Sequence, residues 1–254
     1  MNRIKNIFQT RSEKVIPYLT AGYPRKEDTL SMVLAAESAG AAMVELGIPF
    51  SDPLADGPII QVSSQMAIDN GVNITWILET VSKIRKQSEI PIALMGYVNP
   101  IIKYGLSLFI SDCKKSGVDG LIIPDLPYEE ADDFIKISRE NSITPILLIA
   151  PNTPNIRIQQ ISELAQDLIY CVAILGITGS ASAAIDELKS YLIRVDKYST
   201  CPYIVGFGIS ERSDVININK IAHGTVVGSA IIREIEKCTD SAQSVSNYIE
   251  RLTK

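Results

Sequence analysis

The sequence predicts an α/β fold, a (β/α)₈ barrel that forms a single domain over residues 1–254. The length of 254 residues suits one such barrel. Short apolar runs alternate with amphipathic stretches along the whole chain, as in repeated strand–helix units. The runs are apolar at both parities, as parallel strands covered on both faces require. The competing open doubly wound sheet would carry a glycine fingerprint in its first strand–helix turn, and residues 20–24 (TAGYP) do not match it.

About eight of the apolar runs are short and rich enough in β-branched residues to be strands, which is the number that closes a barrel. In chain order they cover residues 15–19, 42–46, 92–95, 118–123, 145–149, 168–173, 203–205 and 225–227. The spacing leaves room for a helix after each strand. The larger gap between the second and third strands is predicted to hold an extra helix.

Amphipathic stretches between the strands are predicted as helices, among them residues 28–39, 74–86, 129–140, 156–165, 182–198 and 230–252. Asp28 is predicted to cap the first of them. Gly40, Gly71 and Gly117 follow apolar-periodic stretches, where a left-handed glycine commonly ends a helix. No linker, charge block or low-complexity segment divides the chain, which favours one domain.

The composition excludes several classes of protein. With 24 Lys and Arg against 29 Asp and Glu, the net charge of −5 argues against a nucleic-acid binder with a basic surface. The four cysteines are far apart and form no CxxC pair, so neither a zinc ribbon nor a disulfide framework is predicted. The amino terminus shows no secretory signal, and no apolar run reaches the roughly 18 residues that span a bilayer. We therefore expect a cytoplasmic protein that binds neither membrane nor nucleic acid.

The chain has a single histidine, His223, at the start of the last predicted strand. In a barrel the strand starts lie opposite the active site, so His223 is expected to contribute to stability. Carboxyl groups or tyrosines must then carry any acid–base chemistry. Trp76 is most simply a packing residue of a helix.

Two carboxylates lie where a barrel places its active site, at the carboxyl ends of the strands. Glu45 interrupts the apolar second strand, where an ionised side chain is costly to bury without a partner. It is either neutralised in a structural ion pair or acts as an acid–base group with a pKa raised by burial. Asp56 lies in the following loop, residues 48–58, which contains three prolines. It is either a turn former or a second carboxylate that accepts a hydrogen bond from a substrate.

Glycine clusters follow the last three predicted strands, at residues 176–180, 206–210 and 228–230. Each alone is compatible with a tight turn. Together they fit the phosphate site that barrels often build from the loops after strands seven and eight and a helix amino terminus. Tyr170, in the sixth strand, is either a core residue or part of the site.

Residues 45–58 (ELGIPFSDPLADGP) closely resemble the tryptophan synthase α-subunit family. The likeness extends over nearly the whole chain, through residues 17–22, 95–100, 124–127, 206–210 and 228–231. The resemblance implies a TIM barrel with extra helices that acts as a carbon–carbon lyase in tryptophan biosynthesis. It would cleave indole-3-glycerol phosphate to indole and glyceraldehyde 3-phosphate by a retro-aldol reaction, with no cofactor or metal in this chain.

The resemblance also implies roles for individual residues. Glu45 matches the family's general acid–base, Asp56 the carboxylate that holds the indole N–H, and Tyr170 a tyrosine near the catalytic glutamate. The phosphate-binding positions match Gly179, Gly208, Gly228 and Ser229. The indole pocket would be lined by Tyr18, Met95, Ile122 and Phe207.

A partner follows from the same resemblance. It is the PLP-dependent tryptophan synthase β subunit, in an αββα heterotetramer that passes indole through an internal tunnel, with PLP held by the partner. Residues 52–57 and the loop around residues 99–100 are expected at the interface. Residues 176–184 are expected to close over the substrate as a lid.

Two local departures from the family pattern lead to a second hypothesis. Ala173 stands where a serine is common, and Tyr23 stands where an aspartate is frequent. These changes bear on lid closure and signalling between subunits, so the alternative is a catalytically impaired α subunit that acts as an allosteric activator of the β subunit. A third hypothesis, a different sugar-phosphate barrel enzyme, explains the glycines but not the match over residues 45–58.

Overall fold

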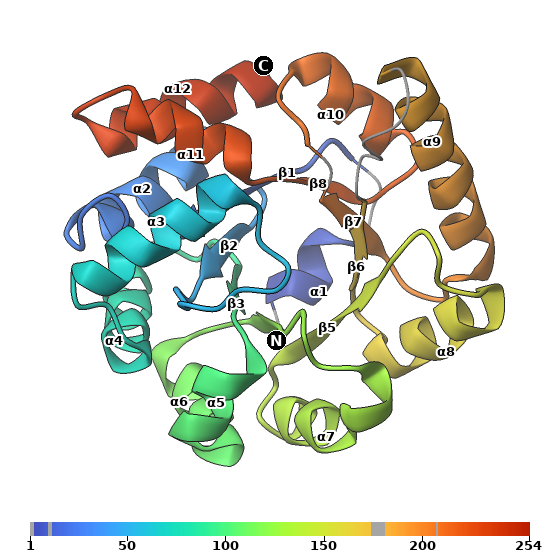
Figure 1. Ribbon diagram of the computed structural model, residues 1–254, viewed down its shortest axis with the longest axis horizontal. Helices are drawn as coiled ribbons and strands as arrows, with labels where there is room; N and C mark the ends of the chain where they lie inside the picture. The colour runs from blue at the N-terminus through green and yellow to red at the C-terminus, as the bar shows by residue number, and fades with distance from the viewer. Residues whose placement is uncertain (1–2, 10–11, 174–180, 207) are drawn as a thin grey trace.

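The structure is a computed structural model that describes residues 3–9, 12–173, 181–206 and 208–254. Eight parallel strands pair in sequence order, and the last pairs with the first, so the sheet closes into a barrel. Seen along the barrel axis, the strands form an inner ring and the helices an outer one (Figure 1). The predicted (β/α)₈ barrel is thereby confirmed.

Each predicted strand overlaps an observed one. The strands are β1 Val15–Thr20, β2 Val44–Gly47, β3 Ile92–Met95, β4 Gly120–Ile122, β5 Thr144–Ile149, β6 Ile169–Val172, β7 Tyr203–Gly206 and β8 Gly224–Val227. They are short and almost entirely buried, because helices cover the outer face and side chains fill the inside. All strands run the same way, so the loops that follow them gather at one rim of the barrel.

The helices are α1 Arg3–Ile7, α2 Asp28–Ser38, α3 Pro58–Asp69, α4 Ile74–Ile84, α5 Val98–Tyr104, α6 Leu106–Ser116, α7 Asp132–Glu140, α8 Asn155–Ala165, α9 Ala181–Tyr198, α10 Arg212–Asn219, α11 Ser229–Glu236 and α12 Ser241–Thr253. The extra helix expected between the second and third strands is α3, which begins with a proline that suits a first turn. Four helices, α1, α5, α6 and α10, were not predicted from the sequence. Of these, α1, α5 and α10 are five to eight residues long, too short to show a clear period. The fourth, α6, has eleven residues and an amphipathic pattern from which it could have been predicted.

Two predicted helices are divided. The stretch 230–252 is not one helix: α11 ends at Glu236, and α12 begins after Asp240, whose side chain accepts the Gln243 amide at 3.0 Å. This cap starts a new helix with its own axis. The stretch 129–140 begins as a 3₁₀ turn, η1 (Tyr128–Glu130), before α7.

The predicted cap at Asp28 is wrong, whereas the three glycine ends are confirmed. Asp28 is already the first residue of α2, and its carboxylate binds the Arg25 guanidinium and the Ser241 hydroxyl instead. Gly40, Gly71 and Gly117 have φ of +97°, +76° and +92°, the left-handed geometry that ends a helix.

The barrel interior is filled by side chains at alternate strand positions, and α1 closes its lower end. This inner cluster includes Ile16, Tyr18, Met43, Ala93, Ile122, Ile146, Leu168, Ile204 and Val226, together with Ile4 and Phe8 from the amino-terminal segment. A second apolar layer lies between the strands and the helices. In Figure 1, α1 is visible inside the ring of strands. The lower end is therefore packed, and the upper rim is where a barrel of this kind carries its active site.

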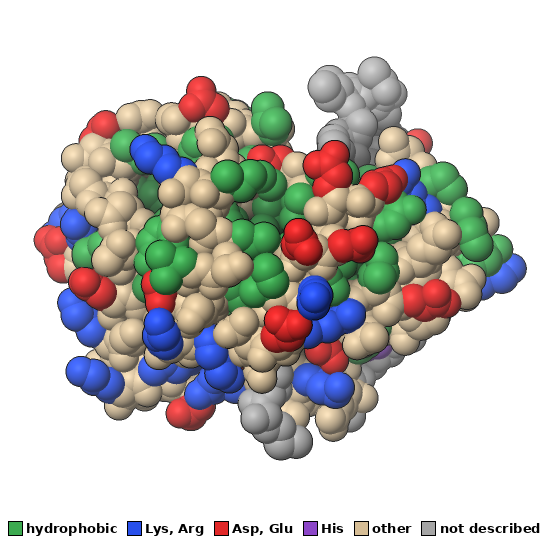
Figure 2. Space-filling model, turned by 90° about the horizontal axis from the view of Figure 1, so that it is seen from below, with side chains coloured by type: hydrophobic (Ala, Val, Ile, Leu, Met, Phe, Trp, Pro, Cys, Tyr) green, Lys and Arg blue, Asp and Glu red, His purple; other side chains and the backbone are tan. Residues whose placement is uncertain are grey.

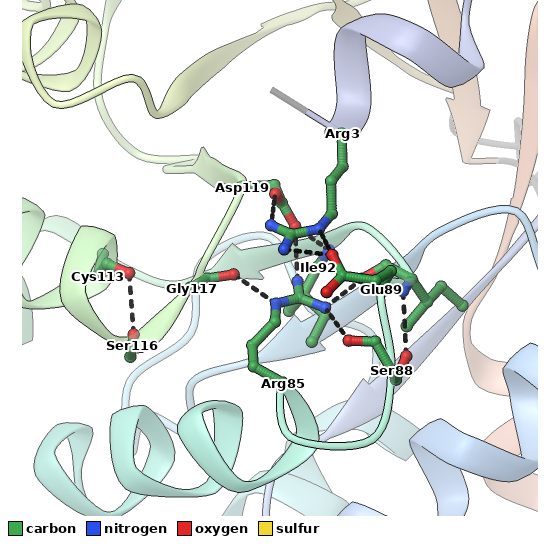
Figure 3. A network of polar contacts seen from close by, with 10 residues as sticks. Arg3, Arg85, Ser88, Glu89, Ile92, Cys113, Ser116, Gly117 and Asp119 are labelled. Atoms are coloured by element: carbon green, nitrogen blue, oxygen red, sulfur yellow. Dashed lines mark hydrogen bonds and ion pairs between the residues drawn. The ribbon is translucent and has the colours of Figure 1, made fainter. Parts of the chain in front are cut away.

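A buried ion cluster joins α1 to the start of β3 and β4 (Figure 3). Asp119, 4% exposed, accepts Arg3 Nη1 at 3.0 Å and Arg85 Nη2 at 2.6 Å. It also accepts the Ile92 amide at 2.9 Å. The cluster lies at the strand starts, so its role is to hold the lower end of the barrel together.

His223 and Trp76 lie where the sequence predicts, at the lower end of the barrel and on a packed helix. His223 precedes β8 at the lower end, with its ring 5.2 Å from that of Tyr203. Trp76 lies on α4, packs against the core, and has the Lys26 ammonium 5.0 Å above its ring. Over the described ranges, no helix is both long and apolar enough to cross a membrane.

Candidate active site

Glu45 points into the barrel from the middle of β2. It is paired with Tyr18 on β1 and Ala93 on β3, both on the inner face. The side chain is 2% exposed, and among the described residues its Oε2 atom has no hydrogen-bond partner. Burial, and secondarily the nearby Asp56 carboxylate, raise the pKa of Glu45 from 4.5 to about 8. Within the described part of the chain no ion pair to Glu45 is found, and the neighbouring charge that acts on its pKa is that of another carboxylate, Asp56.

Asp56 reaches the same region from the loop after β2. Burial raises its pKa, and a hydrogen bond from Tyr97 acts in the opposite direction. Its charge raises the pKa of Glu45, so the two carboxyl groups are electrostatic neighbours. Their environments differ, since Asp56 is half-buried and hydrogen-bonded whereas Glu45 is enclosed. A pair of this kind can divide proton transfer and charge stabilisation between its members.

Tyr97 is a site residue that the sequence analysis did not single out. It follows β3 at the upper rim, and its hydroxyl oxygen accepts the Ala55 amide at 3.1 Å. The Tyr97 ring also lies 5.4 Å from the Phe50 ring. Tyr97 therefore contacts the loop that carries Asp56 at two places, near its start at Phe50 and next to Asp56 at Ala55. The signal was present, because Tyr97 is a polar aromatic residue two positions beyond a strand end, inside a stretch quoted for its family likeness.

Tyr18 and Tyr170 flank Glu45 from inside the barrel. The pKa of Tyr170 is raised by burial and then by Glu45, and that of Tyr18 by burial and then by Asp56. Tyr170 therefore lies near Glu45 as well as packing against the inner cluster. Of the other expected pocket residues, Met95 and Ile122 lie in the inner cluster on β3 and β4, next to each other in register. Phe207 lies outside the described residues.

The expected phosphate positions lie at the ends of two neighbouring strands. Gly208 follows β7 with φ of +20°, and Gly228 follows β8 and caps α11, whose first residue is Ser229. A Cβ atom placed on Gly228 would lie 3.8 Å from Cβ of Tyr18, so the start of α11 borders the carboxyl pair's neighbourhood. A helix start with glycine backbone suits an anion. Gly179 and most of the expected lid lie in residues 174–180, outside the described ranges.

A cavity of about 790 Å³ opens at the rim beside this site. Its walls come from the loops after β4 and β5 and from the inner residues Ile146 and Leu148. Ala55, the neighbour of Asp56, closes it on one side. The cavity thus borders the loop that carries Asp56 and is largely apolar, but neither Glu45 nor Asp56 is among the residues that line it. Within the ranges that the structure covers, no group of three or more His, Cys, Asp or Glu side chains is arranged to hold a metal ion.

The chain is similar to known proteins over its full length. The sequence profile described as tryptophan synthase alpha chain matches residues 4–254. A tryptophan synthase alpha chain from Petrotoga mobilis is 43% identical over 254 residues, covering 100% of this chain and 98% of its own. The crystal structure of tryptophan synthase subunit alpha from Legionella pneumophila is 34% identical, with a TM-score of 0.91 over 99% of this chain and 97% of its own.

A third relative was solved as an assembly. The structure of the tryptophan synthase α2β2 complex from Pyrococcus furiosus contains a chain 37% identical to this one, with a TM-score of 0.85 over 96% of this chain and 98% of that one. The TM-scores of these structures agree with the closed eight-stranded barrel. The chain belongs to the tryptophan synthase alpha chain family.

Proposed function

We infer that this chain is the family's carbon–carbon lyase, which cleaves indole-3-glycerol phosphate to indole and glyceraldehyde 3-phosphate. One observation carries the inference for this chain in particular. A fully enclosed glutamate with a pKa near 8 lies beside a second carboxyl group at the rim where barrels carry out chemistry. A retro-aldol cleavage needs a group that both gives and takes a proton near neutral pH.

Glu45 would move the protons of the reaction. In its protonated form it gives a proton to C3 of the indole ring. The bond between C3 and the glycerol carbon then breaks, its electrons return to the ring, and the carbon becomes the aldehyde as its hydroxyl loses a proton. Glu45 takes that proton, so the enzyme ends the cycle unchanged. A pKa of about 8 leaves both protonation states accessible near neutral pH.

Asp56 would bind the indole N–H and stabilise the positive charge that the ring gains when C3 is protonated. A carboxylate does this best when ionised, and the Tyr97 hydrogen bond favours that form. Tyr170 would orient Glu45, and Tyr18, Met95, Ile122 and Phe207 would line the indole pocket. Gly179, Gly208, Gly228 and Ser229 would hold the phosphate through backbone N–H groups.

The partner would be the tryptophan synthase β subunit in an αββα heterotetramer, with PLP bound in that subunit. Residues 99–100, expected in a loop, lie in α5. An exposed apolar side chain lies in the first expected interface segment, where Leu54 is 85% exposed, and another just beyond the second, where Ile102 on α5 is 66% exposed. Apolar side chains gather on the upper part of the side view in Figure 2. Exposed apolar surface of this kind commonly marks a protein interface. The chain would act in the cytoplasm as a single barrel domain.

The test is indole production from indole-3-glycerol phosphate by the purified chain, alone and with a β subunit. We expect weak activity that rises when β is added. If the folded chain forms no indole in either state but still activates β, the lyase assignment is wrong and the activator hypothesis replaces it.

A further inference from the structure

A charged groove of about 570 Å³ lies in the outer ring of helices, where α10, α11 and α12 meet. In Figure 1, α12 lies beside both of the other helices. A concave space of this size is typical of small-molecule sites. Its walls carry four cationic side chains and two carboxylates, namely Arg212, Arg233, Lys237 and Arg251 with Glu211 and Glu234. Positive charge is therefore concentrated here on a chain whose net charge is −5.

The two carboxylates leave part of this positive charge uncompensated. Glu211 is engaged at the start of α10, where its side chain takes part in a capping box. Glu234 is shared between two cations, because its Oε1 atom lies 2.9 Å from the Lys237 ammonium and 3.6 Å from the Arg251 guanidinium. The exposed Arg233 guanidinium has no hydrogen bond or ion pair within the described ranges. Arg233 and Arg251 therefore keep N–H groups available for a ligand.

Tyr248 brings these two guanidinium groups together. It is buried on α12, and its hydroxyl donates to the Ser210 carbonyl at 3.2 Å. The Arg251 guanidinium lies 4.8 Å from the centre of the Tyr248 ring, a contact that orients this planar donor group. Burial raises the pKa of Tyr248 to about 12, and the charges of Arg251 and Arg233 act against that rise. Both cations therefore lie near the same phenol.

We propose that this groove is a second anion site, which binds a small molecule with two or more negative charges between Arg233 and Arg251. A guanidinium group can give two parallel hydrogen bonds to one phosphate or carboxylate, so both kinds of anion suit the site. Side-chain cations make up this site, whereas backbone N–H groups would make up the expected phosphate site. The two sites adjoin, since Ser210 and Ala230 in the groove follow Gly208 and Gly228 by two residues. Binding here does not depend on the proposed lyase activity.

The experiment is a titration of the purified chain with inorganic pyrophosphate, followed by NMR of the backbone amides and the arginine Nε–H groups. The signals of Arg233 and Arg251 are assigned with Arg233→Gln and Arg251→Gln. We expect both Nε–H signals to shift and to saturate, with a Kd of about 1 mM or lower. Shifts that do not saturate, or that are confined to the amides of Gly208 and Gly228, would overturn the proposal. A parallel titration with citrate, which offers carboxylates in place of phosphoryl groups, identifies the preferred class of anion.

Neutral variants of the groove should change the affinity in opposite directions. Arg233→Gln and Arg251→Gln should each weaken pyrophosphate binding by about tenfold, because each removes charge-assisted hydrogen bonds. Glu234→Gln should strengthen it several-fold, because it removes a negative charge from the wall and releases Lys237. All three side chains are exposed or half-buried, so the variants should fold.

Lys220→Gln is the matched control, since Lys220 is an exposed cation at the end of α10 that does not line the groove. It removes the same charge as the arginine variants and should leave the affinity unchanged. An equal loss of affinity in Lys220→Gln, or weaker binding in Glu234→Gln, would show that pyrophosphate responds to net charge and not to this groove.

Discussion

The hydroxyl group of Tyr97 hydrogen-bonds the carboxyl group of Asp56 while its oxygen accepts the Ala55 amide at 3.1 Å. The amide occupies the oxygen as an acceptor, so the single phenol proton is available for Asp56. The bond stabilises the ionised form of Asp56 and lowers its pKa against the effect of burial. One tyrosine therefore both fixes the loop and sets the charge of the carboxylate that this loop presents.

Substituting Tyr97→Phe should raise the pKa of Asp56, because the ionised carboxylate loses the hydrogen bond that stabilises it. The acidic limb of the pH profile of kcat/KM should move to higher pH by about half a unit to one unit, and kcat/KM near pH 7 should fall roughly tenfold. Tyr104→Phe is the matched control, because Tyr104 donates to Asp112 at 3.0 Å away from the site. An acidic limb that stays in place in Tyr97→Phe would contradict this role.

Substituting Glu45→Gln should reduce kcat for indole formation by about 10²-fold or more while the barrel stays folded, since the amide cannot give or take the proton. Circular dichroism and binding of glycerol 3-phosphate would report an intact fold and phosphate site. Glu79→Gln, an exposed change on α4, serves as the control. Turnover within a few-fold of the parent chain would remove Glu45 from the mechanism.

The fold was predictable from the sequence because buried parallel strands leave a clear pattern. Short runs that are apolar at both odd and even positions predicted all eight strands. A carboxylate inside one of these runs indicated the candidate site. Glu45 could be identified because an ionised carboxyl group is costly to bury, so a glutamate inside an apolar strand is unusual. The same burial raises its pKa and suits it to proton transfer. The short helix α5 was not predicted, because Gly105, with φ of +96°, ends it after seven residues, too few to show a period.

Contacts between distant segments were out of reach of sequence patterns. The bond from Tyr97 to Asp56 joins residues 41 positions apart, and the Ser63 contact to Thr20 spans 43. No period or local motif encodes such pairs, because they depend on how the strands are registered in the closed barrel. The same holds for the hydrogen bond that Ser241 donates to Asp28 from 213 positions away, whereas the Arg25 partner of Asp28 is local.

The raised pKa of Glu45 has a consequence for stability. Between pH 4.5 and about pH 8 the folded chain retains a proton on Glu45 that the unfolded chain releases. The unfolded state binds fewer protons in this window, so the free energy of unfolding falls as pH rises, at up to about 1.4 kcal/mol per pH unit from this group. Glu45→Gln removes the effect. Urea unfolding at pH 5 and pH 7.5 should show the variant gaining stability relative to the parent chain at the higher pH, and a constant difference would refute the shift.

Gly47→Ala should be destabilising because its Cβ atom would overlap the Tyr18 hydroxyl oxygen at 2.1 Å. We expect a loss of about 1–3 kcal/mol in the free energy of unfolding, as for other over-packed cores, with a lower kcat/KM as the phenol is displaced. Gly57→Ala in the next loop is the comparison, since nothing lies within 4 Å of a Cβ atom there. Equal unfolding midpoints for the two variants would mean that the phenol is free to move aside.

Asp119→Asn should be one of the most destabilising changes outside the site. It removes the anion to which Arg3 and Arg85 donate at 3.0 Å and 2.6 Å. Arg3 keeps its ion pair with Glu89, but the Arg85 side chain, only 10% exposed, has no other ion pair among the described residues. Breaking a buried pair in this way costs about 3 kcal/mol, whereas the exposed pair between Glu250 and Lys254 contributes close to nothing, so Glu250→Gln is the control. Because the cluster lies at the strand starts, kcat should be unchanged at temperatures where the variant is folded. Urea unfolding would measure the cost, and a loss smaller than that of an exposed ion pair would show that the cluster does not bind α1 to the barrel.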